Sequence, residues 1–424
     1  MKKKILSCLT VIVLFNFNLS GQETFKVMFY NLLNYPDETG VPNREDDLEF
    51  ILSDYQPDLF LVCELNNSAG ANTILNVTRT ALNSDFEMAT YVSNTSDDLS
   101  GDSNSLQNLL YYDSTKFILE EEIIVPTDLR DFNIYKLLLN TVDQVTNPVE
   151  LYVVVCHLKA SSGPLNEQRR FDMVVELDNY LSTLPSDTNV LLGGDLNLYA
   201  GTEPAFQLLL QDTNNITFAD PVNRVGNWSN NPNFVDVFTQ STRTSSSMGG
   251  TGGGFDDRFD FILTSENMLS TANITYVDGS YEAYGNNGLS ACYNSAINSS
   301  NCAIPGSPYS FEVRDALHNF SDHLPVTVSL EANVTLSVEE FNTIADTVRL
   351  EKSMVNSDLT LIINSSEYFN QNLTVYNTLG QVVDRFQTNT SQKQVFSLSN
   401  LRNGIYFLGF SKSNSQPLKF VISN

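Results

Sequence analysis

The most constraining feature of this chain is a series of short apolar runs, several of them apolar on consecutive positions. A strand with one wet face alternates apolar and polar residues, so a continuous apolar run indicates a strand buried on both faces. Helical spacing of apolar residues occurs at 44–55 and 164–184. This mixture predicts an α/β domain with a large sheet content. The runs expected as strands are 25–33, 57–65, 108–113, 134–142, 149–158, 189–197, 258–265 and 324–330.

Length and charge limit the possible functions. The chain has 424 residues, of which 42% are hydrophobic, enough for one large domain and one smaller one. Aspartate and glutamate outnumber lysine and arginine by 50 to 23, which gives a formal net charge of -27. Such a field repels polyanions unless a local patch or a bound metal reverses it, so it argues against nonspecific nucleic-acid binding.

Residues 1–21 have the pattern of a secretory signal peptide. Three lysines precede an apolar stretch at 5–17, and the small residues Ser20 and Gly21 follow. The apolar stretch is too short to span a bilayer. Since no later stretch is long and apolar enough for a membrane helix, we expect an exported, soluble monomer without stable membrane insertion.

Four cysteines remain after the signal peptide. Cys292 and Cys302 flank a loop-like segment, and in an exported protein this spacing predicts a local disulfide. Cys63 and Cys156 lie inside apolar runs, where buried free thiols are expected. The spacing of the four matches no zinc pattern.

The composition changes after residue 330, where short strand-like runs follow one another without a helix. They predict a small all-β sandwich, with 333–424 as linker and domain. Val338-Glu339, NLTVYNTLGQVV (372–383), LRNGIYFLGF (401–410) and the final LKFVISN resemble the type A sorting domain that Bacteroidetes proteins carry for type IX secretion. The alternative is an adhesive or substrate-binding sandwich.

Several polar residues stand where the apolar runs end. Ionisable groups are costly at such positions unless they are paired, hydrogen-bonded or bound to a metal. Taken singly, each residue could cap or terminate a turn, but together they predict a common site. The set is Asn31, Glu64, His157, Asp195, Asn197, Asp260 and the pair Asp322-His323.

The order and context of these residues resemble the endonuclease/exonuclease/phosphatase superfamily. The matching motifs are GGDLN (193–197), SDHLPV (321–326), RFDFIL (258–263) and CHLK (156–159), while Cys63 stands where many relatives have glutamine. The resemblance covers about 24–330 and implies a four-layer α/β sandwich, with two packed sheets flanked by helices and an active site at one rim. We therefore expect this domain at 22–332.

The resemblance also implies a divalent metal site. Glu64 is expected as the principal ligand, with Asn31 and Asp322 beside it. These hard oxygen ligands suit Mg²⁺ or Mn²⁺, with Ca²⁺ as a possible structural ion.

Catalytic roles follow from the same resemblance. Asp195 is expected to orient or deprotonate the attacking water, or to hold a second metal, and Asn197 to fix this geometry. His157 and His323 are expected to flank the phosphate as oxyanion donors or as acid and base. Asp260 is expected to orient His323, which would face the substrate while Asp322 faces the metal.

Weaker signals surround this set. Arg130 resembles an arginine that contacts a backbone phosphate, and Asn108 is a candidate for lining the cleft. Arg169 and Arg170 are expected on a solvated helix face, and His318 in a loop. The glycine-rich stretch 245–257 lacks the lysine and helix of a phosphate-binding loop and is expected to be a flexible surface loop.

Three functions are compatible with the sequence. The first is a secreted Mg²⁺- or Mn²⁺-dependent phosphodiesterase that cleaves DNA or RNA, against which the missing basic stripe counts. The second is a sphingomyelinase-like or inositol-phosphate phosphatase on the same fold, against which the absence of a clear apolar hairpin counts. The third is an inactive surface binding protein.

Overall fold

The computed structural model describes residues 22–96, 105–270, 272–337, 348–410 and 417–423. The chain divides into two compact units, Met1–Ser337 and Val338–Asn424. The expected signal peptide at 1–21 lies outside the described residues. Across the described part of the chain, no helix has the length and apolar character needed to cross a membrane.

The first unit contains two β-sheets. The larger has the strand order β11-β13-β1-β2-β4-β3, with β12 also paired to β13, and the smaller has the order β5-β6-β7-β8-β10-β9. The larger sheet comprises β1 Gln22–Tyr35, β2 Leu59–Leu65, β3 Phe86–Met88, β4 Gln107–Asp113, β11 Ile274–Tyr276, β12 Glu282–Ala283 and β13 Val326–Asn333. The smaller sheet comprises β5 Phe117–Val125, β6 Phe132–Leu139, β7 Glu150–His157, β8 Val190–Asp195, β9 Phe218–Ala219 and β10 Asp260–Ser265.

The two sheets pack face to face, with β1 and β2 against β7 and β8. Their close approach explains Gly193, the first of the two glycines that precede Asp195, and crowding within the smaller sheet explains Gly194. A Cβ on Gly193 would lie 2.7 Å from a methyl group of Leu61 in the opposite sheet, and one on Gly194 would lie 2.4 Å from the sulfur of Cys156. Both Cys156 and Cys63 are buried free thiols, as the apolar runs predicted.

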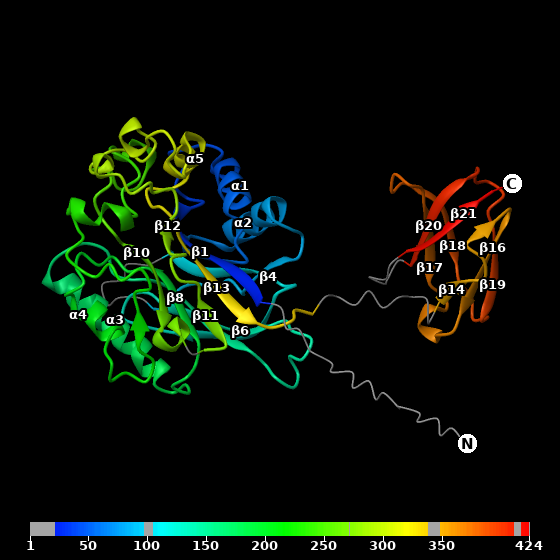
Figure 1. Cartoon of the computed structure of the whole chain (residues 1–424), viewed down its shortest axis with the longest axis horizontal. Helices are drawn as coiled ribbons and strands as arrows, with labels where there is room; N and C mark the ends of the chain where they lie inside the picture. The colour runs from blue at the N-terminus through cyan, green and yellow to red at the C-terminus, as the bar shows by residue number, and fades with distance from the viewer. Residues whose placement is uncertain (1–21, 97–104, 271, 338–347, 411–416, 424) are drawn as a thin grey trace, which may run out of the picture. The chain divides into compact units, whose positions relative to one another are not determined.

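Helices form the outer layers. Figure 1 shows α1 Arg44–Tyr55 and α2 Ser68–Ala81 on one side of the sheets and α3 Pro164–Leu181 and α4 Pro204–Leu209 on the other. Helix α5, Phe311–Phe320, packs against α1. The four-layer α/β sandwich expected from the sequence is therefore confirmed. His318 lies in α5 and not in the loop that the sequence suggested.

Short 3-10 helices punctuate the long connections of this unit. They are η1 Pro232–Val237, η2 Ser246–Met248, η3 Glu266–Leu269, η4 Ser290–Cys292 and η5 Ser300–Cys302. The structure joins Cys292 to Cys302 in a disulfide. Trp228, in the connection between β9 and η1, is fully buried and packs edge-on against Phe206.

The second unit is a small all-β sandwich. One sheet has the order β14-β16-β19 and the other β15-β21-β20-β17-β18. Its core includes Leu361, Val375, Leu408 and Phe420. Its elements are β14 Val348–Leu350, β15 Met354–Val355, β16 Asp358–Ile363, η7 Ser366–Tyr368, β17 Asn372–Tyr376, β18 Val382–Gln387, β19 Lys393–Ser397, β20 Gly404–Phe410 and β21 Leu418–Ile422.

Candidate active site

Strand register brings three of the predicted residues together where β7 and β8 end and β10 begins, on the same side of the smaller sheet. Parallel pairing of β7 with β8 sets His157 opposite Asp195. Antiparallel pairing of β8 with β10 sets Asp260 opposite the same Asp195. All three side chains are buried. The sequence placed each of them at the boundary of an apolar run, and the pairing turns these boundaries into one row.

The larger sheet contributes Asn31 from β1 and Glu64 from β2. The Asn31 side-chain Nδ2 donates to Glu64 Oε1 at 3.0 Å and to Asp195 Oδ2 at 3.1 Å, so one amide links the two sheets. Its Oδ1 accepts a hydrogen bond from the Leu33 backbone N–H at 2.9 Å. The Asn34 backbone N–H donates to the second oxygen of Glu64 at 2.9 Å. The nitrogen of Asn31 therefore faces the carboxylates.

Asp322 and His323 enter from the segment before β13. His323 Nδ1 lies 2.7 Å from Asp260 Oδ2, which is the pairing expected from the resemblance. The other ring nitrogen, Nε2, lies 3.5 Å from Asn31 Nδ2 and 3.9 Å from Asp195 Oδ2. Asp322 Oδ2 accepts a hydrogen bond from the Thr251 backbone N–H at 2.7 Å, and Asp322 Oδ1 is buried without a hydrogen-bond partner.

A cavity of about 370 Å³ opens at this rim. Asn31 and Asp260 stand directly behind its wall, because each is hydrogen-bonded to a lining residue. Asn108 is not among the lining residues, and its amide instead donates to Asp131 O and Asn133 Oδ1. The predicted residues that line the cavity are Glu64, Arg130, His157, Asp195, Asn197, Asp322 and His323.

Two carboxyl groups of the cavity have raised pKa values. Burial, followed by the neighbouring Asp260 carboxylate, raises the pKa of Asp195 to about 8. Burial and then Asp322 raise the pKa of Glu64. Carboxylates crowded in a buried site repel one another, and a cation among them removes that cost.

The two histidines are shifted in opposite directions. Burial lowers the pKa of His157 well below its usual value, and Arg130 lowers it further. Burial also acts to lower the pKa of His323, but Asp260 and Asp322 outweigh it and raise the pKa well above its usual value. A neutral and a protonated imidazole thus face the same cavity, an arrangement typical of sites that move protons.

The donor set fits a hard divalent cation. One oxygen of Glu64, one oxygen of Asp195 and one ring nitrogen of His157 lie within 4.8 Å of one another, and so do ligand atoms of Asp195, Asp260 and His323. The unpartnered Oδ1 of Asp322 is a further available oxygen. Oxygen ligands with few nitrogens and no sulfur favour Mg²⁺ or Mn²⁺ over a structural zinc.

Two cationic side chains differ in their placement. Arg130 lines the cavity but is buried, and its Nη1 donates to the backbone oxygens of His157 and Leu158. Arg170, expected on a solvated face, is fully buried and forms an ion pair with Glu203 at 2.7 Å. The spacing of apolar residues in helix α3 could not predict that this arginine points inward. A guanidinium can be buried only where a carboxylate and backbone oxygens accept its hydrogen bonds, and these contacts come from outside the helix.

Sequence reasoning missed Gln240 and the glycine-rich stretch. Gln240 Nε2 lies 2.6 Å from His323 Nε2 and donates to Asp322 Oδ2 at 3.2 Å. Gly250 and Thr251 line the cavity and pack against Asp322, so the stretch expected to be a flexible surface loop covers part of the site. The run of glycines could have indicated this placement, because a backbone without side chains can approach Asp322 closely.

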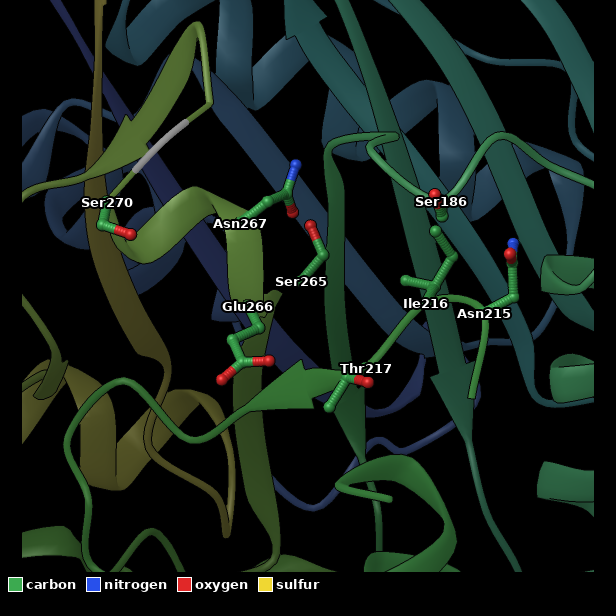
Figure 2. A pocket seen from close by; sticks show the side chains of 8 residues that line it. All are labelled: Ser186, Asn215, Ile216, Thr217, Ser265, Glu266, Asn267 and Ser270. Atoms are coloured by element: carbon green, nitrogen blue, oxygen red, sulfur yellow. The ribbon is translucent and has the colours of Figure 1, made fainter. Parts of the chain in front are cut away.

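A second hollow of about 380 Å³ lies at the other end of β10, beyond Ser265 (Figure 2). Its lining residues are Ser186, Asn215, Ile216, Thr217, Ser265, Glu266, Asn267 and Ser270. This set includes one carboxylate and no histidine, so the second hollow lacks the paired proton-transfer groups of the first cavity.

Comparison with known proteins identifies the second unit. Residues 353–424 match the family described as secretion system C-terminal sorting domain. The chain is therefore a protein exported by the type IX secretion system to the cell surface or the extracellular space. No curated protein matches the sequence.

The solved structures similar to this chain include endonuclease/exonuclease/phosphatase proteins. One from Bacteroides vulgatus is 14% identical with a TM-score of 0.45, covering 73% of this chain and 99% of its own. The human Nocturnin catalytic domain with bound sulfate is 14% identical with a TM-score of 0.44 over 72% of this chain and 94% of its own. D. rerio TDP2 with a single-strand DNA product is 15% identical with a TM-score of 0.44 over 72% and 98%. At these values no conclusion about the reaction rests on the likeness.

Proposed function

We propose that this chain is an exported, divalent-metal-dependent phosphoesterase, and that it hydrolyses phosphodiester bonds of extracellular DNA or RNA. The observation that carries the proposal is the convergence of four carboxylates and two oppositely shifted histidines on one 370 Å³ cavity. The export signal of the second unit agrees with an extracellular substrate.

Glu64 would hold the cation, with the free Oδ1 of Asp322 beside it. Asn31, expected as a further ligand, has its amide nitrogen toward the carboxylates and its oxygen bonded to the Leu33 N–H, so it positions Glu64 instead. When bound, the cation supplies positive charge that offsets the charge of the phosphate and of its leaving oxygen. The Asn34 N–H and the Asn31 amide hold the two oxygens of Glu64, and this fixes the direction of the carboxylate. Asn31 also keeps Glu64 at a set separation from Asp195, so both sheets share in positioning the ligand.

Asp195 is the group we assign to the attacking water. Its Oδ1 accepts the Asn197 backbone N–H at 3.0 Å, which leaves Oδ2 to face His157 Nε2 at 3.5 Å and the cavity. Asn197 is itself held by a bond from its Nδ2 to Leu158 O at 3.3 Å. Oδ2 also accepts a hydrogen bond from Asn31 Nδ2 at 3.1 Å, and its remaining lone pair can orient a water or accept its proton.

His323 is assigned to the phosphate or to the leaving oxygen. Because Nδ1 is paired with Asp260, only Nε2 can reach a substrate, and its protonated state suits a donor to developing negative charge. The lowered pKa of His157 favours its neutral form, so its Nε2, 3.5 Å from Asp195 Oδ2, is assigned as a hydrogen-bond partner for the substrate or the water.

The test uses the mature chain that starts at Gln22. Plasmid DNA and RNA should be cleaved with Mg²⁺ or Mn²⁺, and cleavage should stop when EDTA is added. Hydrolysis of sphingomyelin or inositol phosphates without cleavage of nucleic acid would replace the substrate class and keep the chemistry. An absence of metal-dependent turnover on every phosphoester would contradict the proposal and favour a binding protein.

A further inference from the structure

The cations of the first unit are almost all committed to internal contacts. Between residues 22 and 337 the sequence has nine arginines and four lysines. A protein that grips a long nucleic-acid strand needs such groups on its surface, where each neutralises one phosphate. Their placement therefore bears on the size of the substrate.

Six of the nine arginines are buried. Arg258 is fully buried and forms two hydrogen bonds with Asp220. Arg243 donates to the backbone oxygens of His318 and Asn319. Arg314 on α5 donates to the backbone oxygens of Ile297 and Ser299, which lie in the loop closed by the disulfide. The buried set is Arg44, Arg130, Arg170, Arg243, Arg258 and Arg314.

The more exposed cations are also neutralised in part. Lys116 pairs with Asp58 at 2.6 Å, and Arg224 pairs with Asp236 at 2.7 Å. Lys136 lies between Glu120 at 2.7 Å and Glu150 at 2.9 Å. These pairs leave little net positive charge for a chain of phosphates.

Carboxylates also outnumber cationic side chains in the lining of the cavity. Among its lining residues, Arg130 is the one lysine or arginine, and four carboxylates accompany it: Glu64, Asp195, Asp257 and Asp322. A bound divalent cation would offset part of this charge at one point only. Lys159, the other cation that acts on this site, adds to burial and Arg130 in lowering the pKa of His157, and its Nζ donates to Ala160 O at 3.1 Å. A second phosphate along a strand would therefore meet mainly carboxylates.

We infer that this site recognises a single phosphodiester, with one phosphate in reach of the protein, and gains no affinity from a longer polyanion. The inference rests on the proposed phosphoesterase function and names its substrate class: dinucleotides and similar single-phosphate diesters. Each phosphate neutralised on a single strand adds about -0.7 to the slope of log affinity against log salt, so this site has a slope near that of one contact.

The experiment compares a thymidine dinucleotide with an oligothymidylate of about 20 nucleotides, using the mature full-length chain at one saturating Mg²⁺ concentration across a series of NaCl concentrations. Expressed per cleavable linkage, kcat/KM should agree within about threefold, and the salt slope on the long strand should be about -1 or shallower. A long-strand advantage above about 100-fold, or a slope steeper than about -3, would overturn the inference.

Two further measurements separate the possible failures. Arg79→Gln removes an exposed cation on α2, outside the cavity, and should leave both substrates unchanged. A selective loss on the long strand would show that surface cations bind it and would overturn the inference. Turnover of the dinucleotide reports the proposed function independently, so its absence on both substrates overturns the phosphoesterase assignment and the inference together.

Discussion

At the scale of the residue, the pairing of His323 with Asp260 is the contact on which the proposed reaction depends most directly. The carboxylate lies 2.7 Å from Nδ1 and is itself fully buried, so it fixes both the ring's orientation and which nitrogen faces the cavity. A ring in the same position but in the other tautomer presents the same nitrogen to the substrate in the wrong protonation state.

Asp260→Asn should therefore lower kcat by roughly 10²- to 10⁴-fold, the usual contribution of one positioned acid or base. The amide preserves the shape of the carboxylate but does not stabilise the charged ring. Steady-state kinetics on a dinucleotide, with circular dichroism to confirm folding, measures the effect. Asp236→Asn, which alters an exposed carboxylate paired with Arg224, is the matched control and should keep full activity. A kcat for Asp260→Asn within threefold of the parent's would contradict the role.

The raised pKa of Asp195 predicts how the metal-free protein responds to pH. Because its pKa rises from 3.8 to about 8 on folding, the folded state binds the proton more tightly than the unfolded state does. The stabilisation is complete below about pH 4 and is lost as the pH rises toward 8. Urea denaturation in EDTA should show the free energy of unfolding falling across this range, and Asp195→Asn should make the dependence shallower. An equally steep dependence in that variant would contradict the assignment.

Much of the site could be predicted at this scale, because a charged or amide residue directly after an apolar run is costly to bury unless it has a specific partner. Glu64, His157 and Asp195 line the cavity as that argument required. Gln240 could not be found in the same way, since it follows no buried run and its position depends on contacts made 82 and 83 residues away. Asn108, a weaker candidate that precedes an apolar run, lies outside the cavity lining, because its amide donates to the Asp131 backbone oxygen and to Asn133 Oδ1.

At the scale of the element, the glycine-rich stretch is held onto the site from both sides. Arg243 donates to the backbone oxygens of Met248 and Gly249, and Ser241 Oγ donates to Thr251 O at 2.6 Å. The resulting strap presents the Thr251 N–H to Asp322. Its glycines permit a backbone path that side chains would block.

Gly250→Ala should disturb Asp322, because the new Cβ would lie 2.6 Å from the carboxylate carbon and the residue has a φ of +65°. We expect the Mg²⁺ concentration for half-maximal activity to rise about tenfold or more, as the supporting contacts of a metal ligand usually require. Gly253→Ala is the matched control, since it has a φ of +120° and nothing within 4 Å of its added Cβ. An equal effect in both variants would point to backbone strain and contradict the specific contact.

Two helices lie where the spacing of apolar residues predicted them, whereas one further helix and one edge strand were missed. Helix α1 occupies 44–55 as expected, and α3 ends at Leu181, three residues before the predicted boundary. Helix α2 was missed although Ile74, Leu75 and Val77 give it a buried apolar face and the Asn67 side chain caps its N-terminus at Gly70 N. Its threonines and asparagines have low intrinsic helix propensity, which obscured the helical pattern. Strand β5 was missed because it lies at the sheet edge with exposed glutamates in its middle.

At the scale of the whole molecule, chemistry and export belong to separate units. The cavity-lining residues fall between Leu33 and His323, and the sorting-domain match begins at residue 353. The sequence predicted this division from the change in composition, and the structure divides the chain after Ser337.

A chain that ends at Ser337 should keep the kcat of the full-length protein, because every residue assigned to the reaction lies before that point. It should at the same time remain inside the cell when expressed in a host with type IX secretion. Activity assays of the purified protein, together with fractionation of the host culture, test both parts. A large loss of kcat in the shortened chain would show that the second unit contributes to the reaction.

One feature of the larger sheet reaches beyond the reaction itself. Antiparallel pairing of β1 with β13 places Gln22 opposite Asn333, while the other end of the pair leads toward Asn31 and His323. Entry and exit of the catalytic unit are thus neighbours, at the end of the sheet remote from the reactive rim. A short linker could close the unit into a ring for circular permutation, or the unit could be grafted into a host protein's loop with its cavity still open to solvent.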